Sequence, residues 1–307
     1  MTALKVIVFE GVQNLPLFAA QANGLFAGQG LDIDLTFTPD SGTLRNGLAE
    51  GRFDIAHTAV DNAIAMVELA HKDVAIVLGG DNGFNSLFFQ PEIRSFEDSR
   101  GKTVLVDAPN TAFALVLYKI LDNHGLKRGD YAIQPVGATP FRLTRMKEDK
   151  SAAAAILNLP YRILGSRAGL KFICDAVSEI GPYLSTTGFV LRPWAEANAD
   201  TLVRYIRAYV GGLRWALDPQ NKQAAVGLLA DRLRLPADIA LEAYEIATAP
   251  ATGLTRDAHV DIPGFANVLK LRASVEGQWD GVAAEPARYL DMSYHAKAIA
   301  TMSQRAA

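Results

Sequence analysis

Short apolar runs and stretches of helical periodicity alternate along the first 70 residues of the chain. The short runs are rich in Val and Ile or alternate apolar with polar side chains, as β-strands do. Between them, apolar residues recur at the spacing of one helix face. The expected strands are residues 4–9, 31–37 and 53–58, and the expected helices are residues 15–27, 42–50 and 62–71. The pattern predicts a βαβαβα unit.

The same order of elements returns after residue 100. The expected strands are residues 103–107, 131–136 and 152–157, and the expected helices are residues 111–124 and 139–148. Gly24 and Gly125 take matching places, each where the first helix of its unit ends. Because the two copies share little sequence identity, we interpret them as repeated architecture.

Two such units predict an α/β fold with two lobes, each a mostly parallel sheet flanked by helices. Residues 84–89 and 181–191 read as extended segments that cross between the lobes and form a hinge. We therefore expect lobe I to hold residues 1–84 and 188–307, and lobe II to hold residues 85–187. Helices expected after residue 192 would pack mostly on lobe I, at residues 199–217, 220–233, 237–247, 262–276 and 286–302.

Several segments resemble the solute-binding proteins of ABC importers, in the branch that takes up nitrate, sulfonates, taurine and thiamine-pyrimidine precursors. They are residues 11–26 (GVQNLPLFAAQANGLF), 30–35 (GLDIDL), 51–62 (GRFDIAHTAVDN), 95–104 (SFEDSRGKTV), 136–140 (VGATP), 158–160 (NLP), 194–198 (WAEAN) and 215–219 (WALDP). The resemblance runs through nearly the whole chain. It implies a type II periplasmic-binding-protein fold that binds a small molecule without transforming it, and ligand identity varies widely among such proteins.

Composition narrows the classes of partner. Half of the 307 residues are hydrophobic, enough to fill two cores, and the net charge of −3 comes from evenly mixed charges. The sequence therefore offers no basic stripe for nucleic acid and no polybasic or long apolar segment for a membrane. Cys174 is the only cysteine, which excludes an internal disulfide and a multi-cysteine metal site. We expect a monomer that needs no cofactor and no metal.

The start of the chain bears on its location. Met1, Thr2 and Ala3 lead at once into the first expected strand, with no basic start, apolar core or cleavage site of a leader. As written, the chain would stay in the cytoplasm. If a leader was removed, the resemblance implies the periplasm and an ABC permease as partner.

Candidate ligand residues lie where strands end and helices begin, because ligands of such sheets bind beyond the carboxyl ends of the strands. Asn14 precedes the first helix and could bind a ligand or cap the helix. Thr58 ends the third strand and Asp61 opens the next helix, so one of them could cap and the other remain free for ligand. Asp61 would favour a cationic or N–H-bearing ligand.

In the second unit, Thr111 and Ala112 sit at a strand-to-helix turn, where backbone N–H groups could bind an anionic oxygen or simply be capped. Asn158 and Tyr161 flank the end of the last strand, and Phe84 and Thr187 lie on the crossings. Together these residues suggest a small organic ligand with an anionic group and aromatic or heteroaromatic character.

Two further residues near the expected cleft could serve either the ligand or the fold. Tyr183, on a crossing, could stack on a planar ligand or serve plain packing. Arg142, one turn into the helix at 139–148, could pair with an anion or be an exposed residue bound to surface carboxylates, and it is not among the predicted ligand residues.

Known catalytic motifs are absent: the sequence has no Gly-x-Ser-x-Gly elbow, P-loop, His-Glu-x-x-His pair or calcium loop. His57 stands at a strand end beside the expected pocket and could act as an acid or base, or only pack there. One cysteine argues against the cysteine- and histidine-rich pyrimidine synthases that resemble these binding proteins.

The sequence thus predicts a two-lobed, hinge-closing protein that binds a small organic solute. Two alternatives stay open. One is a leaderless enzyme such as an aromatic-carboxylate decarboxylase, in which His57 or Asp61 would manage a proton. The other is a cytoplasmic ligand sensor.

Overall fold

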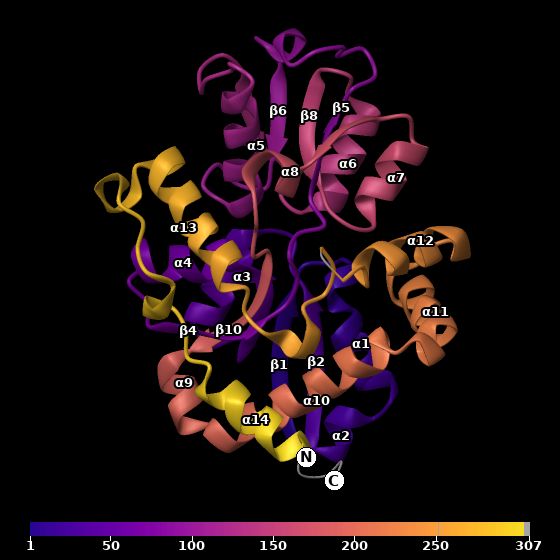
Figure 1. Ribbon diagram of the computed structural model, residues 1–307, viewed down its shortest axis with the longest axis vertical. Helices are drawn as coiled ribbons and strands as arrows, with labels where there is room; N and C mark the ends of the chain where they lie inside the picture. Colours follow the sequence, from indigo (N-terminus) through magenta and orange to yellow (C-terminus); the bar gives the residue numbers. More distant parts are fainter. Residues whose placement is uncertain (251, 304–307) are drawn as a thin grey trace.

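The protein has two lobes, each built on a five-stranded sheet, and its computed structural model describes residues 1–250 and 252–303. Figure 1 shows the lobes one above the other, with β5, β6 and β8 in the upper lobe and β1, β2, β4 and β10 in the lower one. The predicted two-lobed α/β fold is confirmed.

The first sheet has the strand order β2-β1-β3-β10-β4. Its strands are β1 (Thr2–Val8), β2 (Leu31–Phe37), β3 (Ile55–Ala59), β4 (Val74–Gly79) and β10 (Thr186–Leu191). β1 runs parallel to β2 and β3, whereas β10 runs antiparallel to β3 and β4. The helices that follow its early strands are α1 (Leu15–Ala22), α2 (Leu25–Gly28), α3 (Ser41–Ala49) and α4 (Val60–Glu68).

The second sheet has the order β7-β6-β8-β5-β9, which repeats the arrangement of the first. Its strands are β5 (Ser86–Phe89), β6 (Thr103–Val106), β7 (Ala132–Pro135), β8 (Ala152–Leu157) and β9 (Lys171–Asp175). β6 is parallel to β7 and β8, and β5 is antiparallel to β8 and β9. The helices of this lobe are α5 (Ala112–Asn123), α6 (Thr139–Glu148), α7 (Tyr161–Arg167) and α8 (Ala176–Ile180).

The chain crosses between the two sheets twice. It leaves the first sheet at the end of β4 and joins the second at β5, and it returns between β9 and β10. In each sheet the fourth strand, β10 or β5, is thus supplied by a segment next to a crossing, and it is the antiparallel one. These two connections are the only covalent links between the described parts of the two sheets.

The rest of the chain is helical. Its α-helices are α9 (Arg192–Ala197), α10 (Ala199–Leu217), α11 (Lys222–Leu233), α12 (Ala237–Ala247), α13 (Ile262–Glu276) and α14 (Ser293–Ser303). Short 3-10 turns are η1 (Val12–Asn14), η2 (Glu97–Ser99), η3 (Pro219–Asn221), η4 (Arg256–Ala258), η5 (Gln278–Gly281) and η6 (Pro286–Arg288). α10 packs on α1, α2 and α14 in the lower lobe, whereas α13 also contacts α5 and so bridges the lobes.

The structure differs from the expected elements in a few places. The helix expected at 15–27 is two helices, because Gly24 takes a left-handed conformation (φ 64°) between α1 and α2. Gly125 has a positive φ at the end of α5 in the same way, as the matching positions predicted. Helices α7 and α8 and strand β9 were not predicted. Strand β9 gives little signal, because Lys171–Asp175 is short, lies at the edge of its sheet and has an exposed start.

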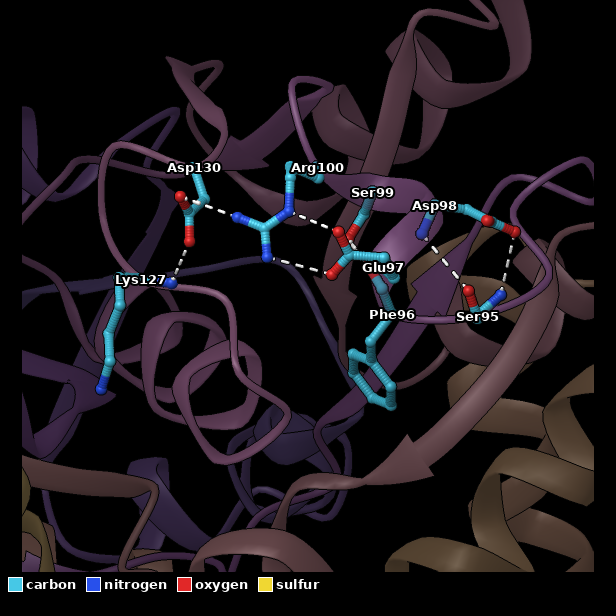
Figure 2. Close-up of polar contacts among 8 residues, drawn as sticks. All are labelled: Ser95, Phe96, Glu97, Asp98, Ser99, Arg100, Lys127 and Asp130. Carbon is cyan, nitrogen blue, oxygen red and sulfur yellow. Dashed lines mark hydrogen bonds and ion pairs between the residues drawn. The ribbon is translucent and has the colours of Figure 1, made fainter.

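The segment that leads into β6 is held by its own polar side chains (Figure 2). Asp98 accepts hydrogen bonds from the backbone N–H groups of Arg94 (2.9 Å) and Ser95 (3.2 Å). Arg100 contacts Glu97 through two bonds and Asp130 at 2.8 Å. The polar residues of this segment therefore fix a turn, and none of them lines the cleft described below.

One close helix crossing supports a stability prediction. Gly212 of α10 faces the backbone of α1 so closely that a Cβ atom would lie 2.3 Å from the carbonyl oxygen of Pro16. We expect Gly212→Ala to lower the free energy of unfolding by about 1–3 kcal/mol, because the two helices must move apart. Gly227, in α11, has open space around it, so Gly227→Ala should raise stability by about 0.5–1 kcal/mol. Urea denaturation measures both, and equal effects would contradict the close crossing.

Candidate ligand-binding cleft

A cleft between the lobes is lined by polar side chains from both of them and from the crossings. From the first lobe come Phe9, Glu10, Gln13, Ser41, Thr58, Ala59 and Asn62. From the crossings come Asp81, Phe84, Asn85, Ser185 and Thr186. From the second lobe come Asp107, Thr111, Ala112, Phe113, Ala138, Thr139, Arg142 and Asn158.

The cleft has a volume of about 610 Å³ with its solvent-open mouth included. This volume is in the range of small-molecule sites.

Strand ends place the polar groups in the cleft. Glu10 follows β1, Thr58 lies near the end of β3, Asp107 follows β6 and Asn158 follows β8. β1 is parallel to β3 in the first sheet and β6 is parallel to β8 in the second, so within each sheet the two carboxyl ends lie at the same edge, and both edges contribute to the cleft. These are the edges at which ligands of parallel α/β sheets bind.

Direct contacts join the two lobes at the edges of the cleft. The Ser41 hydroxyl donates a hydrogen bond of 2.5 Å to Asp107 Oδ2. The backbone N–H of Ala138 donates to the carbonyl oxygen of Pro39 at 2.9 Å. Tyr161 of α7 lies near Glu10, whose carboxylate adds to the effect of burial in raising the pKa of the Tyr161 hydroxyl. The structure is therefore a conformation in which the lobes touch.

The first turn of α5 forms part of the wall. The backbone N–H of Thr111 bonds the carbonyl oxygen of Ala108 at 3.3 Å, and the Thr111 hydroxyl donates to the same oxygen at 2.9 Å. The next N–H groups, of Ala112 and Phe113, belong to the first turn of a helix and have no acceptor within it. Ala112 and Phe113 both line the cleft.

Arg142 is a buried cation in the second-lobe wall, only 1 % exposed. Its guanidinium donates to the carbonyl oxygen of Gly137 at 2.6 Å, to Thr139 Oγ1 at 2.9 Å and to the carbonyl oxygen of Ile156 at 3.2 Å. Burial lowers the pKa of Arg142 to about 10, and the charge of Asp107 opposes that shift. The interpretation of Arg142 as an exposed residue bound to surface carboxylates is wrong.

Two aspartates contribute to the cleft wall: Asp81, which is buried, and Asp107, which is half-buried and acts on the charge of Arg142. Asp81 is 1 % exposed, and its Oδ1 accepts a hydrogen bond of 2.9 Å from the backbone N–H of Gly83. Burial raises the pKa of the Asp81 carboxyl, and the neighbouring polar groups of Thr186, Gly83 and Ser185 oppose that shift. Asp81 Oδ2 and Asp107 Oδ1 are buried without a hydrogen-bond partner.

The structure brings five of the nine predicted ligand residues to the cleft. These are Thr58, Phe84, Thr111, Ala112 and Asn158. The Thr58 hydroxyl accepts a hydrogen bond of 3.3 Å from Asn62 Nδ2, and Asn158 Oδ1 is buried without a partner. Their role as ligand contacts stays a prediction.

The other four predicted residues lie outside the lining. Asn14 donates to the carbonyl oxygen of Phe9 at 2.7 Å and makes no side-chain cap to the helix that follows it. Tyr161 lies near Glu10, and Thr187 is fully buried in β10, where its neighbour Thr186 lines the cleft instead. Asp61 forms an ion pair of 2.6 Å with Arg272 of α13, and both side chains are buried.

His57, the proposed acid or base, also lies outside the lining. Its Nε2 is 2.8 Å from the Tyr205 hydroxyl, and its ring stacks on Tyr209 at a centroid distance of 4.8 Å. Both tyrosines belong to α10, on the side of the sheet away from Thr58. Burial lowers the pKa of His57 to about 3, so the imidazole is neutral near pH 7.

Sequence reasoning missed Asp81, Asp107 and Arg142. Asp107 had a usable signal, since it follows β6 just as Asn158 follows the neighbouring parallel strand β8. Asp81 lies in the Gly-rich crossing after β4, where no periodicity indicates which way a side chain points. Among the described residues, no group of three or more His, Cys, Asp or Glu side chains could hold a metal ion.

Comparisons with known proteins agree with this architecture. A family model described as "NMT1/THI5 like" matches residues 12–222. No curated protein sequence matches the chain significantly.

Three solved structures illustrate the range of proteins that share the fold. The periplasmic nitrate-binding protein NrtA from Synechocystis PCC 6803 has a TM-score of 0.81 at 13% identity, over 98% of this chain and 89% of that one. The periplasmic aliphatic sulphonate binding protein SsuA from Escherichia coli has a TM-score of 0.71 at 18% identity, over 95% and 92%. The desulfurization enzyme DSZB has a TM-score of 0.68 at 11% identity, over 98% and 100%.

Proposed function

The chain belongs to the NMT1/THI5-like family, and on this premise we propose that it is a solute-binding protein that captures a small organic molecule between its lobes. The observation that carries the proposal is the cleft itself, where buried polar atoms from both lobes and from the first crossing face one space without hydrogen-bond partners. A binding protein needs such groups because a ligand can satisfy them.

Capture would change the balance between open and closed lobes. A ligand that contacts both walls binds the closed conformation better than the open one, so it shifts the population toward closure. Hydrogen bonds between the lobes, such as that from Ser41 to Asp107, then stabilise the closed state further. Delivery of the solute to an ABC permease, with the protein in the periplasm, belongs to this proposal. In the described residues, no helix is long and apolar enough to cross a membrane.

Different groups in the cleft favour different properties of the ligand. The first turn of α5 supports the anionic group predicted from the sequence, because N–H groups at a helix start attract negative charge. Phe84 and Phe113 support an aromatic portion. The carboxylates of Asp81 and Asp107 in the same cleft act against an anion.

An enzyme on this fold would need groups that handle a proton at the cleft. His57 and Asp61, which the sequence suggested for that role, lie outside the cleft lining. Glu10, Asp81 and Asp107 are the carboxyl groups that do line it. The similarity to a desulfurization enzyme concerns the fold alone and does not favour an enzyme over a binding protein.

Mass spectrometry tests the proposal directly. The purified protein is unfolded, any released small molecule is identified, and that molecule is then incubated with freshly refolded protein. We expect the molecule to be recovered unchanged and to bind in a one-to-one ratio. The His57→Gln variant should bind it in the same ratio and also leave it unchanged. Conversion of the molecule to a product would indicate an enzyme. If no released molecule binds to the refolded protein, the proposal is contradicted.

A further inference from the structure

The hydrogen-bonding groups of the cleft are strongly unbalanced toward acceptors. Five lining side chains carry a buried oxygen without a partner, namely Gln13, Asn62, Asp81, Asp107 and Asn158. In the described part of the lining, the one buried side-chain nitrogen without a partner is Asn85 Nδ2. A buried acceptor left without a donor is costly, so this cleft is built to receive donors.

The two aspartates decide the direction of this imbalance. An amide can turn so that either its oxygen or its nitrogen faces the cleft, but an ionised carboxylate has only acceptors. In the ionised form, Asp81 Oδ2 and Asp107 Oδ1 are acceptors whichever way the neighbouring amides turn. Asp81 is at least nine-tenths buried, so water supplies little compensation.

The charged side chains of the cleft lining also favour a ligand that donates hydrogen bonds. The lining holds three carboxyl groups, Glu10, Asp81 and Asp107, against one guanidinium, Arg142. None of the three carboxyl groups forms an ion pair within the described ranges, and the guanidinium charges that act on Asp107 are those of Arg45 and Arg142. Arg142 already donates to three protein oxygens, so few of its N–H groups remain for an anion. A ligand with positive charge would supply what the carboxylates lack.

We propose that the solute is a small organic cation, an amine, amidine or guanidine, whose N–H groups contact Asp81 and Asp107. The proposal rests on the proposed function and specifies its ligand. A planar N–H-bearing cation can give two parallel hydrogen bonds to a carboxylate, the strongest geometry available to such a pair. Asn62 and Asn158 offer further acceptors in the same space.

Matched pairs of probes test the charge of the ligand. Benzamidinium and benzoate have the same ring and nearly the same planar end group but opposite charge, and acetamidinium and acetate form a smaller pair without the ring. Isothermal titration of each into ligand-free protein should show that, in at least one pair, the cation binds at least tenfold more tightly than its anion. Stronger binding of the anions, or no binding in either pair, would overturn the proposal.

Variants locate the effect. We expect Asp81→Asn and Asp107→Asn each to weaken cation binding by about tenfold or more, since each removes a negative charge that would pair with the cation inside the cleft. Asp231→Asn, an exposed carboxyl of α11 outside the cleft, is the control and should leave binding unchanged. Unchanged binding in both cleft variants would also overturn the proposal.

A second measurement separates a ligand site from a structural one. Asp81→Asn should raise the melting temperature of the ligand-free protein by a few degrees, because an unpaired buried carboxylate destabilises the folded state. A lower melting temperature would mean that Asp81 serves the fold and would count against the proposal. Tighter binding of benzoate than of benzamidinium would contradict the proposal that the ligand is a cation, but not the proposal that the protein binds a solute. The mass-spectrometric experiment tests solute binding independently of the ligand's charge.

Discussion

Asp61→Ala is expected to destabilise the protein by about 3–5 kcal/mol, because it leaves the Arg272 guanidinium buried without its partner. The two charges lie 2.6 Å apart, and their side chains are 2 % and 1 % exposed. The pair joins α4 to α13, the helix that also reaches α5 of the second lobe. Urea denaturation at neutral pH measures the loss.

An exposed pair provides the matched control for this prediction. Arg204 and Asp200 lie 2.9 Å apart on α10, and the Asp200 side chain is 86% exposed. Asp200→Ala should change stability by no more than about 0.5 kcal/mol. If the two alanine variants lose similar stability, the buried pair does not hold the helices as described. Because Asp61 lies outside the cleft, its replacement is not expected to act on the ligand directly.

A large loss of stability on acidification is expected from His57. Burial between β3 and α10 lowers its pKa to about 3, whereas the unfolded chain binds a proton near the ordinary value of 6.5. Below pH 6.5 the unfolded chain binds a proton at His57, whereas the folded protein does not. The free energy of unfolding therefore falls as the pH falls. Between pH 7 and about pH 4.5 this difference amounts to about 2.5 kcal/mol.

Variants isolate that contribution from those of other titrating groups. His57→Gln should remove about 2.5 kcal/mol of the pH dependence measured by urea denaturation between the two pH values. Gly227→Ala, which changes no titratable group and has open space around it, should leave the pH dependence as it is in the parent protein. A His57→Gln curve parallel to the parent curve would show that His57 is not held neutral in the fold.

Local patterns carried the prediction of the fold. The helices expected at 237–247 and 262–276 have the bounds of α12 and α13, because their apolar stripes end at clear signals. Gly277, for example, takes a left-handed conformation just after α13. The helix at 15–27 was split for the same reason, since Gly24 allows the turn that separates α1 from α2.

The cleft was harder to predict because side-chain direction depends on distant parts of the chain. His57 and Thr58 are neighbours on β3, and only Thr58 lines the cleft. Asp61 stands one turn further on, but Arg272, 211 residues later, draws it into the helical layer. Arg142 reads as a surface residue on a polar helix until Gly137, Thr139 and Ile156 surround its guanidinium. Local periodicity contains none of these contacts.

The distance between the lobes, measured with and without the captured molecule, tests the central claim most directly. Spin labels at Asn46→Cys on α3 and Thr144→Cys on α6, both exposed, report it in a Cys174→Ser background. With the molecule released in the mass-spectrometric experiment, the account predicts a shift to shorter distances that reverses when the molecule is removed. Identical distance distributions with and without the bound molecule would contradict a cleft that closes on its solute.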